Sequence, residues 1–293
     1  MQVFFRRAGL LFILSFAACS DGGVRGGDAS ARFDAAIEPP AGDAATTGND
    51  ALGPSDAAAA KPLWQEVAAA SDGKIHLLFI GNSLTYYTAS DPMPATLAQL
   101  SVGRAHPVAP TMITTDGFHL QDHWDDPQHR AVDAIHTRAF NVVVLQEYSD
   151  YPNTNPASYE MYAQLFDKEI KDAGALTVLY LTFANSDRPG DQAGLTVENI
   201  KLGGLLGDHV SPVGEAWKSA LSSPELPGLV LHNLPDDTKH PNAKGAFLTG
   251  AVFYAMIYGV SANGLAAPAD VDPAVVTALE DVAWATVNRA MPW

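Results

Sequence analysis

The sequence predicts an α/β fold in which a parallel five-stranded sheet carries helices on both faces. Short apolar runs alternate with longer stretches of helical pattern from Pro62 onward, and strands that alternate with helices usually form parallel sheets. One run, residues 142–145, is so apolar that both of its faces must be covered. The candidate site residues Ser83, Gly117 and Gln146 each follow a predicted strand. Active sites lie at this carboxyl edge in such sheets.

The predicted strands are short apolar runs bounded by turn-forming residues. The first ends at Gly81 and the second ends at Asp116 and Gly117, and glycine and aspartate at such positions favour a chain reversal. The five predicted strands are residues 75–80, 108–115, 142–145, 176–181 and 229–234.

The predicted helices are the longer segments between these strands. One of them stops near Gly174, a residue type that commonly ends helices. Another, residues 243–258, is a long apolar helix that follows the last candidate site residues. The predicted helices are residues 94–100, 127–138, 158–171, 212–221, 243–258 and 273–289.

The first 18 residues have the pattern of an export signal. An arginine pair precedes an apolar stretch at 8–16, and two alanines then precede Cys19, the single cysteine of the chain. The apolar stretch is too short to cross a bilayer as a helix. This arrangement resembles a bacterial lipoprotein signal, although Phe16 stands where leucine is usual. We predict a signal peptide at 1–18 and lipidation of Cys19; the alternative is an ordinary signal peptide with a chance cysteine.

The segment that follows is expected to be a disordered tether. Residues 19–60 are rich in Ala, Asp, Gly and Pro and contain no lysine, so they cannot bury enough apolar surface to offset chain entropy. We predict that residues 61–293 form a single folded domain, the one that contains the candidate site residues. The predicted location is outside the cytoplasm, periplasmic or at the cell surface, with the membrane reached only through the N-terminal lipid. The sequence leaves open whether the anchor enters the inner or the outer membrane.

The charge balance excludes one class of partner. The chain has 33 acidic and 17 basic residues, which gives a formal net charge of −16. Nucleic-acid phosphates would be repelled by such a surface, so we expect no nucleic-acid partner.

Three side chains have the types that a serine hydrolase needs. Ser83 follows an apolar run and a glycine, while Asp237 and His240 lie three residues apart far downstream. A serine hydroxyl is a weak nucleophile until a base takes its proton, and a carboxylate fixes the tautomer of a histidine base. A spacing of three puts both side chains on one face of a turn. The alternative for His240 is an ordinary surface or core histidine.

Four sequence blocks resemble the SGNH (GDSL-like) hydrolase superfamily. Gly-Asn-Ser-Leu-Thr at 81–85 and Asp-Thr-Lys-His-Pro-Asn at 237–242 are similar to its first and last blocks. Leu-Gln-Glu at 145–147 and Pro-Val-Gly-Glu-Ala-Trp at 212–217 are similar to a bacterial subgroup. The resemblance covers about residues 74–260, and it implies a three-layer, flavodoxin-like sandwich.

The resemblance also implies a role for each site residue. Ser83 would be the nucleophile, His240 the general base and acid, and Asp237 the carboxylate that orients it. The oxyanion hole would consist of the N–H groups of Ser83 and Gly117 and the amide of Gln146. The family usually has an asparagine in the block where this chain has the longer Gln146.

Aromatic residues near these blocks are candidates for a substrate pocket. Tyr86 and Tyr87 follow the nucleophile block, and His123 and Trp124 lie beyond Gly117. Aromatic rings at such places can stack on a sugar or an aryl group. The alternative for the two tyrosines is packing against the helix that follows, and for His123 it is a polar loop beside Gly117.

Histidines near Gly117 could also suggest a metal. His119 and His123 are four residues apart, with Asp122 beside them, and two histidines at helical spacing can share a zinc ion. We favour a polar loop instead, because acyl transfer to serine needs no metal and no cysteine contributes. Since the chain has no glycine-rich loop of the kind that holds phosphates, we expect no cofactor.

Together these patterns predict a serine esterase. The resemblance and the predicted location outside the cytoplasm imply that it hydrolyses small acyl esters, with acetyl as the expected group and an acylated glycan as the expected kind of substrate. Three alternatives remain at this point. An acyltransferase would use the same triad, a carbohydrate-binding lipoprotein would keep the fold without catalysis, and a metal-dependent hydrolase would use the His119 region.

Overall fold

The strands of this protein form one parallel sheet, as the sequence predicted. The computed structural model describes residues 61–67, 69–87, 92–137 and 139–289. The strand order is β2-β1-β3-β4-β5, and every neighbouring pair is parallel. The prediction of a three-layer α/β sandwich with a five-stranded parallel sheet is confirmed. The strands are β1 (Ile75–Gly81), β2 (Val108–Thr114), β3 (Val142–Leu145), β4 (Leu176–Tyr180) and β5 (His209–Ser211).

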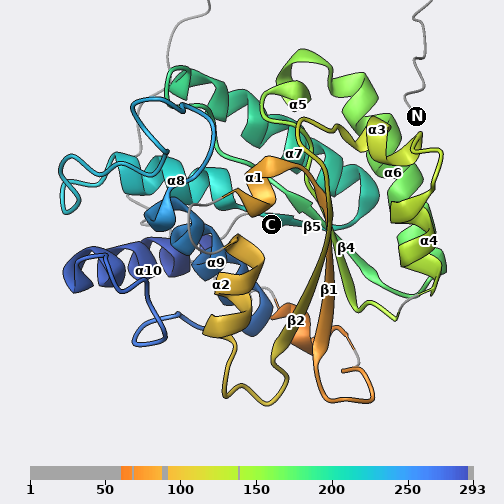
Figure 1. Ribbon diagram of the computed structural model, residues 1–293, viewed down its shortest axis with the longest axis horizontal. Helices are drawn as coiled ribbons and strands as arrows, with labels where there is room; N and C mark the ends of the chain where they lie inside the picture. Colours follow the sequence, from red (N-terminus) through yellow and green to blue (C-terminus); the bar gives the residue numbers. More distant parts are fainter. Residues whose placement is uncertain (1–60, 68, 88–91, 138, 290–293) are drawn as a thin grey trace, which may run out of the picture. The chain divides into compact units, whose positions relative to one another are not determined.

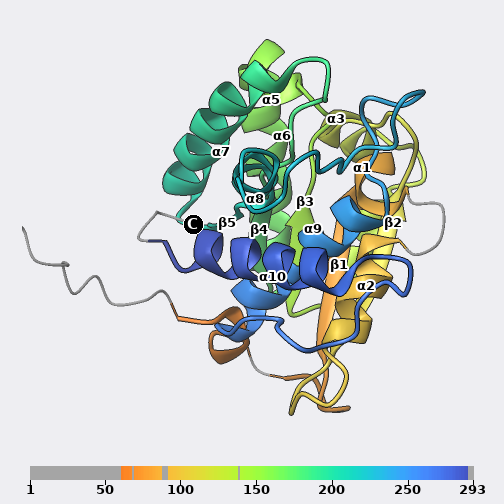
Figure 2. The same ribbon diagram turned by 90° about the vertical axis from the view of Figure 1, so that its left-hand side faces the viewer.

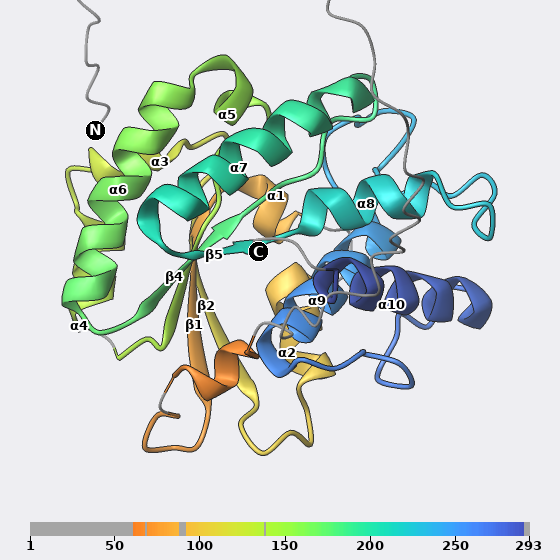
Figure 3. The same cartoon turned by 180° about the vertical axis from the view of Figure 1, so that it is seen from behind.

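Helices cover both faces of the sheet. Figures 1 and 3 show α2, α8, α9 and α10 on one side and α4 and α6 on the other. Figure 2, with the first group in front, shows α10 lying across α9, and these two helices are in contact. The helical segments are η1 (Leu63–Gln65), α1 (Ser83–Tyr86), α2 (Met93–Leu100), α3 (Leu120–Trp124), α4 (Arg130–Thr137), α5 (Tyr151–Thr154), α6 (Pro156–Asp172), η2 (Pro189–Asp191), α7 (Gln192–Leu206), α8 (Val213–Leu221), α9 (Ala243–Tyr258) and α10 (Pro273–Val287).

The alternation of side chains along β1 explains the two layers. Ile75, Leu77 and Phe79 lie in the core that contains α2, α8, α9 and α10. Leu78 and Ile80 lie in the other core, with α3, α4, α6 and α7. All five are buried, as expected when successive side chains of a strand point to opposite faces and both faces are covered.

The predicted fifth strand is wrong. Residues 229–234 make only one isolated bridge, between His232 and Pro241. The amide of Asn242 donates hydrogen bonds to the carbonyls of Val230 and His232, at 2.9 and 3.0 Å, and so takes acceptors that a neighbouring strand would need. The fifth strand is instead β5. It is only three residues long, and its sequence contains no apolar run that would predict a strand.

Helix α7 was missing from the prediction, because its glycines are untypical of a helix interior. A Cβ atom on Gly203 would lie 2.5 Å from a methyl group of Val210, and one on Gly194 would lie 2.5 Å from Asn153 Oδ1. These glycines therefore allow α7 to pack closely against β5 and α5. The other predicted helices and strands lie within three residues of their observed bounds.

Residues 1–60 lie outside the described residues, so the predicted signal peptide, the lipidation of Cys19 and the tether stay predictions. Among the helices that the structure describes, none has the length and apolar character needed to cross a membrane.

Glu280 of α10 gives a stability prediction. Its side chain is 2 % exposed, and its Oε1 has no hydrogen-bond partner among the described residues. Burial raises the pKa of Glu280 to about 7. The folded state therefore holds a proton that the unfolded state has lost between pH 4.5 and 7, and the free energy of unfolding should fall as the pH rises through this window.

We expect Glu280→Gln to stabilise the protein above pH 7 by up to about 3 kcal/mol, because the amide is neutral at every pH. The gain should shrink toward pH 4.5, where the glutamic acid is protonated in both states. Urea unfolding at several pH values measures this, with Glu225→Gln at an exposed position as the control. A gain of equal size at pH 5 and pH 8 would contradict the prediction.

Candidate active site

The turn after β1 places Ser83 at the carboxyl edge of the sheet. Asn82 caps the short helix α1, with its Oδ1 accepting a hydrogen bond from the N–H of Leu84 at 3.1 Å. Ser83 is the first residue of that helix and is 8 % exposed. Gly81 has no room for a side chain, since a Cβ atom there would lie 2.5 Å from Gln146 Oε1. This tight packing fixes the position of the serine.

Asp237 and His240 lie on one compact turn, as their spacing predicted. His240 Nδ1 lies 2.7 Å from Asp237 Oδ2. The second carboxylate oxygen, Oδ1, accepts hydrogen bonds from the backbone N–H groups of Lys239 and His240, both at 3.0 Å. The carboxylate thus holds both the imidazole ring and the backbone that carries it.

Ser83 and His240 come together across 157 positions of the sequence. His240 Nε2 lies 2.8 Å from Ser83 Oγ. The segment before α9 is held in place by the N–H of Asn233, which donates to the carbonyl of His240 at 2.9 Å. The ring of Tyr87 covers the imidazole, with 4.1 Å between ring centroids. The three predicted triad side chains therefore form one continuous hydrogen-bonded chain.

The environment of Asp237 favours its charged form. Burial raises the pKa of this carboxyl, but the hydrogen bonds from the N–H groups of His240 and Lys239 and from the His240 ring outweigh burial. The net effect is a pKa below the usual value for aspartic acid. Asp237 is therefore a carboxylate at neutral pH, and it accepts from a protonated Nδ1 of His240.

A cavity of about 270 Å³ lies at Ser83. Gly117 lies in its wall with a φ of +70°, a left-handed conformation that favours glycine. Within the described part of the chain, no hydrogen bond takes up the N–H of Ser83 or that of Gly117. These two groups are free to receive an oxyanion. The lining residues are Ser83, Leu84, Tyr87, Asp116, Gly117, Tyr148, Ser149, Lys239 and His240.

Gln146 does not occupy the oxyanion-hole position that the resemblance implied. Its side chain is completely buried and is not in the cavity wall. Nε2 donates to Asn82 Oδ1 at 3.0 Å and to the carbonyl of Glu147 at 2.6 Å, so both amide hydrogens are used. Oε1 accepts from the N–H of Asn82 at 2.8 Å and from the hydroxyl of Thr85 at 2.9 Å. Gln146 therefore holds the turn that carries Ser83 in place.

Of the four candidate pocket residues, the structure places only Tyr87 in the cavity wall. Tyr86 donates to Asp116, and this hydrogen bond raises its pKa to about 12. His123 is 1 % exposed and donates to the carbonyl of Gly81 at 2.7 Å; burial lowers its pKa. Trp124 packs edge-on against Phe166 in the core. The expectation for His123 and Trp124 is wrong, because α3 turns both side chains toward the interior.

Several residues of the cavity wall were missed by the sequence reasoning. Lys239 Nζ donates to the hydroxyl of Tyr148 at 3.2 Å, and it lies 5.6 Å from the centroid of that ring. Ser149 has a φ of +29°, and its hydroxyl bonds Asn185 Oδ1 at 3.0 Å. Asp116 completes the polar part of the wall. Lys239 and Asp116 directly precede His240 and Gly117, and Tyr148 and Ser149 are the two residues after the Leu-Gln-Glu block; this proximity was the signal available in the sequence.

The histidines near Gly117 do not converge on a metal-binding position. His119 Nδ1 lies 3.0 Å from Glu147 Oε1, and this hydrogen bond raises the pKa of His119 although burial opposes it. Across the part of the chain that the structure describes, no group of three or more His, Cys, Asp or Glu side chains could hold a metal ion. His119 thus fixes Glu147 beside the third strand.

Comparisons with known proteins bear on the fold. No protein-family model and no curated protein matches the sequence. A DUF4886 family protein from Bacteroides uniformis has a similar structure, with a TM-score of 0.59, 14 % identity, and coverage of 72 % of this chain and 93 % of that protein. A proposed SGNH hydrolase from Slackia heliotrinireducens gives a TM-score of 0.52 at 22 % identity, over 63 % of this chain and 99 % of that protein.

This chain shares its fold with both proteins. A lipase/acylhydrolase from Enterococcus faecalis is more distant, with a TM-score of 0.46 and 15 % identity over 63 % of this chain and 96 % of that protein. At such identities the first two likenesses show the architecture, while activity has to be argued from the residues of this chain.

Proposed function

We propose that this protein is a serine hydrolase of carboxylic esters. The observation that supports the proposal best is the position of His240, 2.8 Å from Ser83 Oγ and 2.7 Å from Asp237 Oδ2. A base within hydrogen-bond reach of a hydroxyl and oriented by a carboxylate is the arrangement that activates serine. The description of one structural neighbour as a proposed SGNH hydrolase agrees with it.

The reaction follows from this geometry. With Nδ1 donating to Asp237, Nε2 of His240 accepts the Ser83 proton while Oγ attacks the ester carbonyl carbon. The N–H groups of Ser83 and Gly117 receive the oxyanion of the tetrahedral intermediate. His240 then gives this proton to the alcohol oxygen as the bond between that oxygen and the carbonyl carbon breaks. The alcohol departs, and the acyl group stays on Ser83. A water molecule, deprotonated by the same nitrogen, then attacks the acyl-serine. The acid is released, and the proton returns to Ser83 Oγ.

The proposed substrate is a small acyl ester, most simply an acetyl ester on a glycan. A cavity of about 270 Å³ has room for a short acyl group and for part of the leaving group. Asp116 and Lys239 add charged groups to its wall, and the ring of Tyr87 is 40 % exposed. Polar groups beside an accessible aromatic face suit a hydroxylated leaving group such as a sugar.

The proposal is tested with the full chain and p-nitrophenyl esters of increasing acyl length. We expect hydrolysis of the acetate, a lower kcat/KM for the octanoate, unchanged rates in EDTA, and release of acetate from an acetylated xylan. Inhibition by EDTA would point to metal chemistry instead. A preference for octanoate would overturn the acetyl assignment, and no turnover of any ester would overturn the esterase.

We also propose that Cys19 carries a lipid that anchors the exported protein to a membrane. The support is the sequence pattern alone, since this residue lies outside the described residues. Expression in a bacterium supplied with labelled palmitate should label the protein and place it in the membrane fraction. Cys19→Ala should abolish the label and shift the protein to the soluble fraction, whereas Ser20→Ala should do neither. A labelled, membrane-bound Cys19→Ala protein would contradict the proposal.

A further inference from the structure

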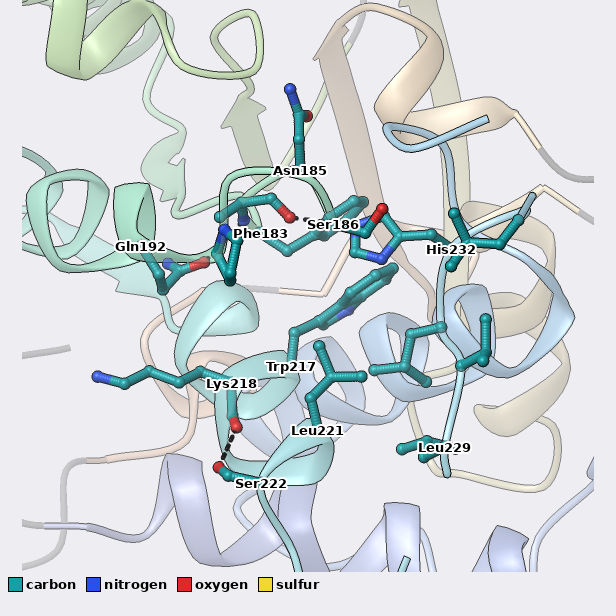
Figure 4. Close-up of a pocket in the computed structure, with 15 residues that line it drawn as sticks. Phe183, Asn185, Ser186, Gln192, Trp217, Lys218, Leu221, Ser222, Leu229 and His232 are labelled. Atoms are coloured by element: carbon teal, nitrogen blue, oxygen red, sulfur yellow. Dashed lines mark hydrogen bonds between the residues drawn. The ribbon is translucent and has the colours of Figure 1, made fainter. Parts of the chain in front are cut away.

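A second cavity, of about 460 Å³, lies beside α8 (Figure 4). Its walls come from α8, from the segment that follows β4, and from residues 229–234. Among the described residues, it shares no lining residue with the cavity at Ser83. Sites for small organic molecules usually measure about 300 to 1,000 Å³. The second cavity is therefore large enough for a ligand of its own.

Aromatic rings form a fixed, apolar wall of this cavity. Phe183 and Trp217 stack with 3.5 Å between centroids and 5° between planes. His232 meets the Trp217 ring edge-on at 5.0 Å. Trp217 Nε1 donates to Thr249 Oγ1 at 3.1 Å, and Thr249 does not line the cavity, so the single polar group of the indole is already used. All three rings are at least 97 % buried in the protein, and so their positions are set before any ligand arrives.

The titratable and amide side chains of the wall make the cavity suitable for an uncharged molecule. Burial lowers the pKa of His232 even though its ring donates to the carbonyl of Ala184 at 3.1 Å, so this histidine is neutral at pH 7. Lys218 is 58 % exposed, lies 3.7 Å from Glu215 and points away from the other lining side chains. Gln192 bonds backbone groups with both ends of its amide. Among the described lining residues, no charged group is therefore directed into the cavity.

Apolar side chains remain exposed at the rim. Leu221 and Leu234 are each 44 % exposed and Val230 is 36 % exposed. Clustered apolar surface around a concavity usually marks a binding site, because an occupant removes it from water.

Hydrogen bonds link the lining of the second cavity to the lining of the cavity at Ser83 and to the segment that carries Asp237 and His240. The N–H of Ser186 donates to the carbonyl of Thr238 at 2.9 Å, and that of Asn233 donates to the carbonyl of His240 at 2.9 Å. The hydroxyl of Ser149 also bonds Asn185. A molecule in the second cavity would touch this lining without meeting Ser83.

We propose that the second cavity is a binding site for an uncharged small molecule with a ring or a short alkyl chain, separate from the ester site. Trp217 and Phe183 supply its floor, and Leu221, Val230 and Leu234 close over the ligand. The binding part of this proposal stands without the esterase, while its independence from ester binding rests on the proposed function.

The test is a fluorescence titration of the full chain with N-phenyl-1-naphthylamine, a neutral aromatic probe that brightens in apolar surroundings. We expect one probe molecule per chain, with the same Kd for wild type and Ser83→Ala. Leu221→Arg puts a charge at the mouth and removes an apolar contact, which should raise Kd by about tenfold or more. The matched control is Leu205→Arg, on an exposed leucine of α7 that lines neither cavity; its Kd should be unchanged.

Ser222→Trp fills the mouth by bulk rather than by charge, and it should weaken the probe as well. Absence of probe binding to folded wild type would overturn the proposal, as would an unchanged Kd in both mouth variants. In ester hydrolysis, saturating probe should leave KM within about twofold. A KM that rises in proportion to probe concentration would make the cavity part of the ester site. Probe binding without ester hydrolysis would contradict the proposed function and leave the binding site supported.

Discussion

Ser83→Ala and His240→Ala are each expected to lower kcat/KM for p-nitrophenyl acetate by about 10³- to 10⁶-fold. Ser83→Ala removes the oxygen that attacks the carbonyl. His240→Ala removes the group that lies 2.8 Å from that oxygen and is placed to take its proton. Neither side chain belongs to the apolar cores, so both variants should unfold within a few degrees of wild type.

The double variant separates a triad from two independent contributors. Since Ser83 and His240 act in one proton transfer, removing both should cost about as much as removing either alone. The matched control is Ser149→Ala, which changes another serine of the cavity wall whose hydroxyl bonds Asn185 rather than His240. It should retain at least about a tenth of the activity. Effects that multiply in the double variant would contradict a joint role.

Gln146→Leu is expected to lower the free energy of unfolding by about 2 to 5 kcal/mol. The substitution replaces the amide with an apolar side chain of similar size, and it leaves the N–H of Asn82 and the hydroxyl of Thr85 without their acceptor. The side chain is completely buried, so water cannot replace the lost partner. Urea unfolding of wild type and variant measures the difference.

The control for this loss is Gln164→Leu, at an exposed position of α6 where the amide bonds only Glu160; it should change stability by less than about 0.5 kcal/mol. Gln146→Leu should also lower kcat, because Asn82 sets the position of Ser83. A Gln146→Leu protein with wild-type stability and a large loss of kcat would contradict the structural role and restore the amide as an oxyanion donor.

The parts of the fold that the sequence predicted are those with strong local patterns. The short apolar runs of Ile75–Gly81 and Val142–Leu145 identify buried strands. Helix α7 and strand β5 were not predicted, because contacts between distant parts of the chain stabilise them rather than a local sequence pattern. Gly203 would weaken an isolated helix, yet here it allows contact with Val210. The run at 229–234 has a strand-like composition, but Asn242 takes its carbonyls.

In the candidate site, too, the features set by local sequence could be predicted, and those set by tertiary contacts could not. Ser83, Asp237 and His240 could be predicted because a glycine turn and a spacing of three decide their local geometry. The direction of a long side chain cannot be read from its neighbours in the sequence. Gln146 follows a strand as predicted, yet its amide turns inward to Asn82. His123 likewise turns inward to Gly81.

The most direct test of the central claim, that Ser83 is an activated nucleophile, is the site of attack by a fluorophosphonate. The full chain is incubated with the reagent, and the adduct is located by mass spectrometry of its peptides. The account predicts one adduct per chain, on Ser83, with labelling at least about 10³-fold slower in His240→Ala. An adduct on another residue, or labelling that is equally fast without His240, would contradict it.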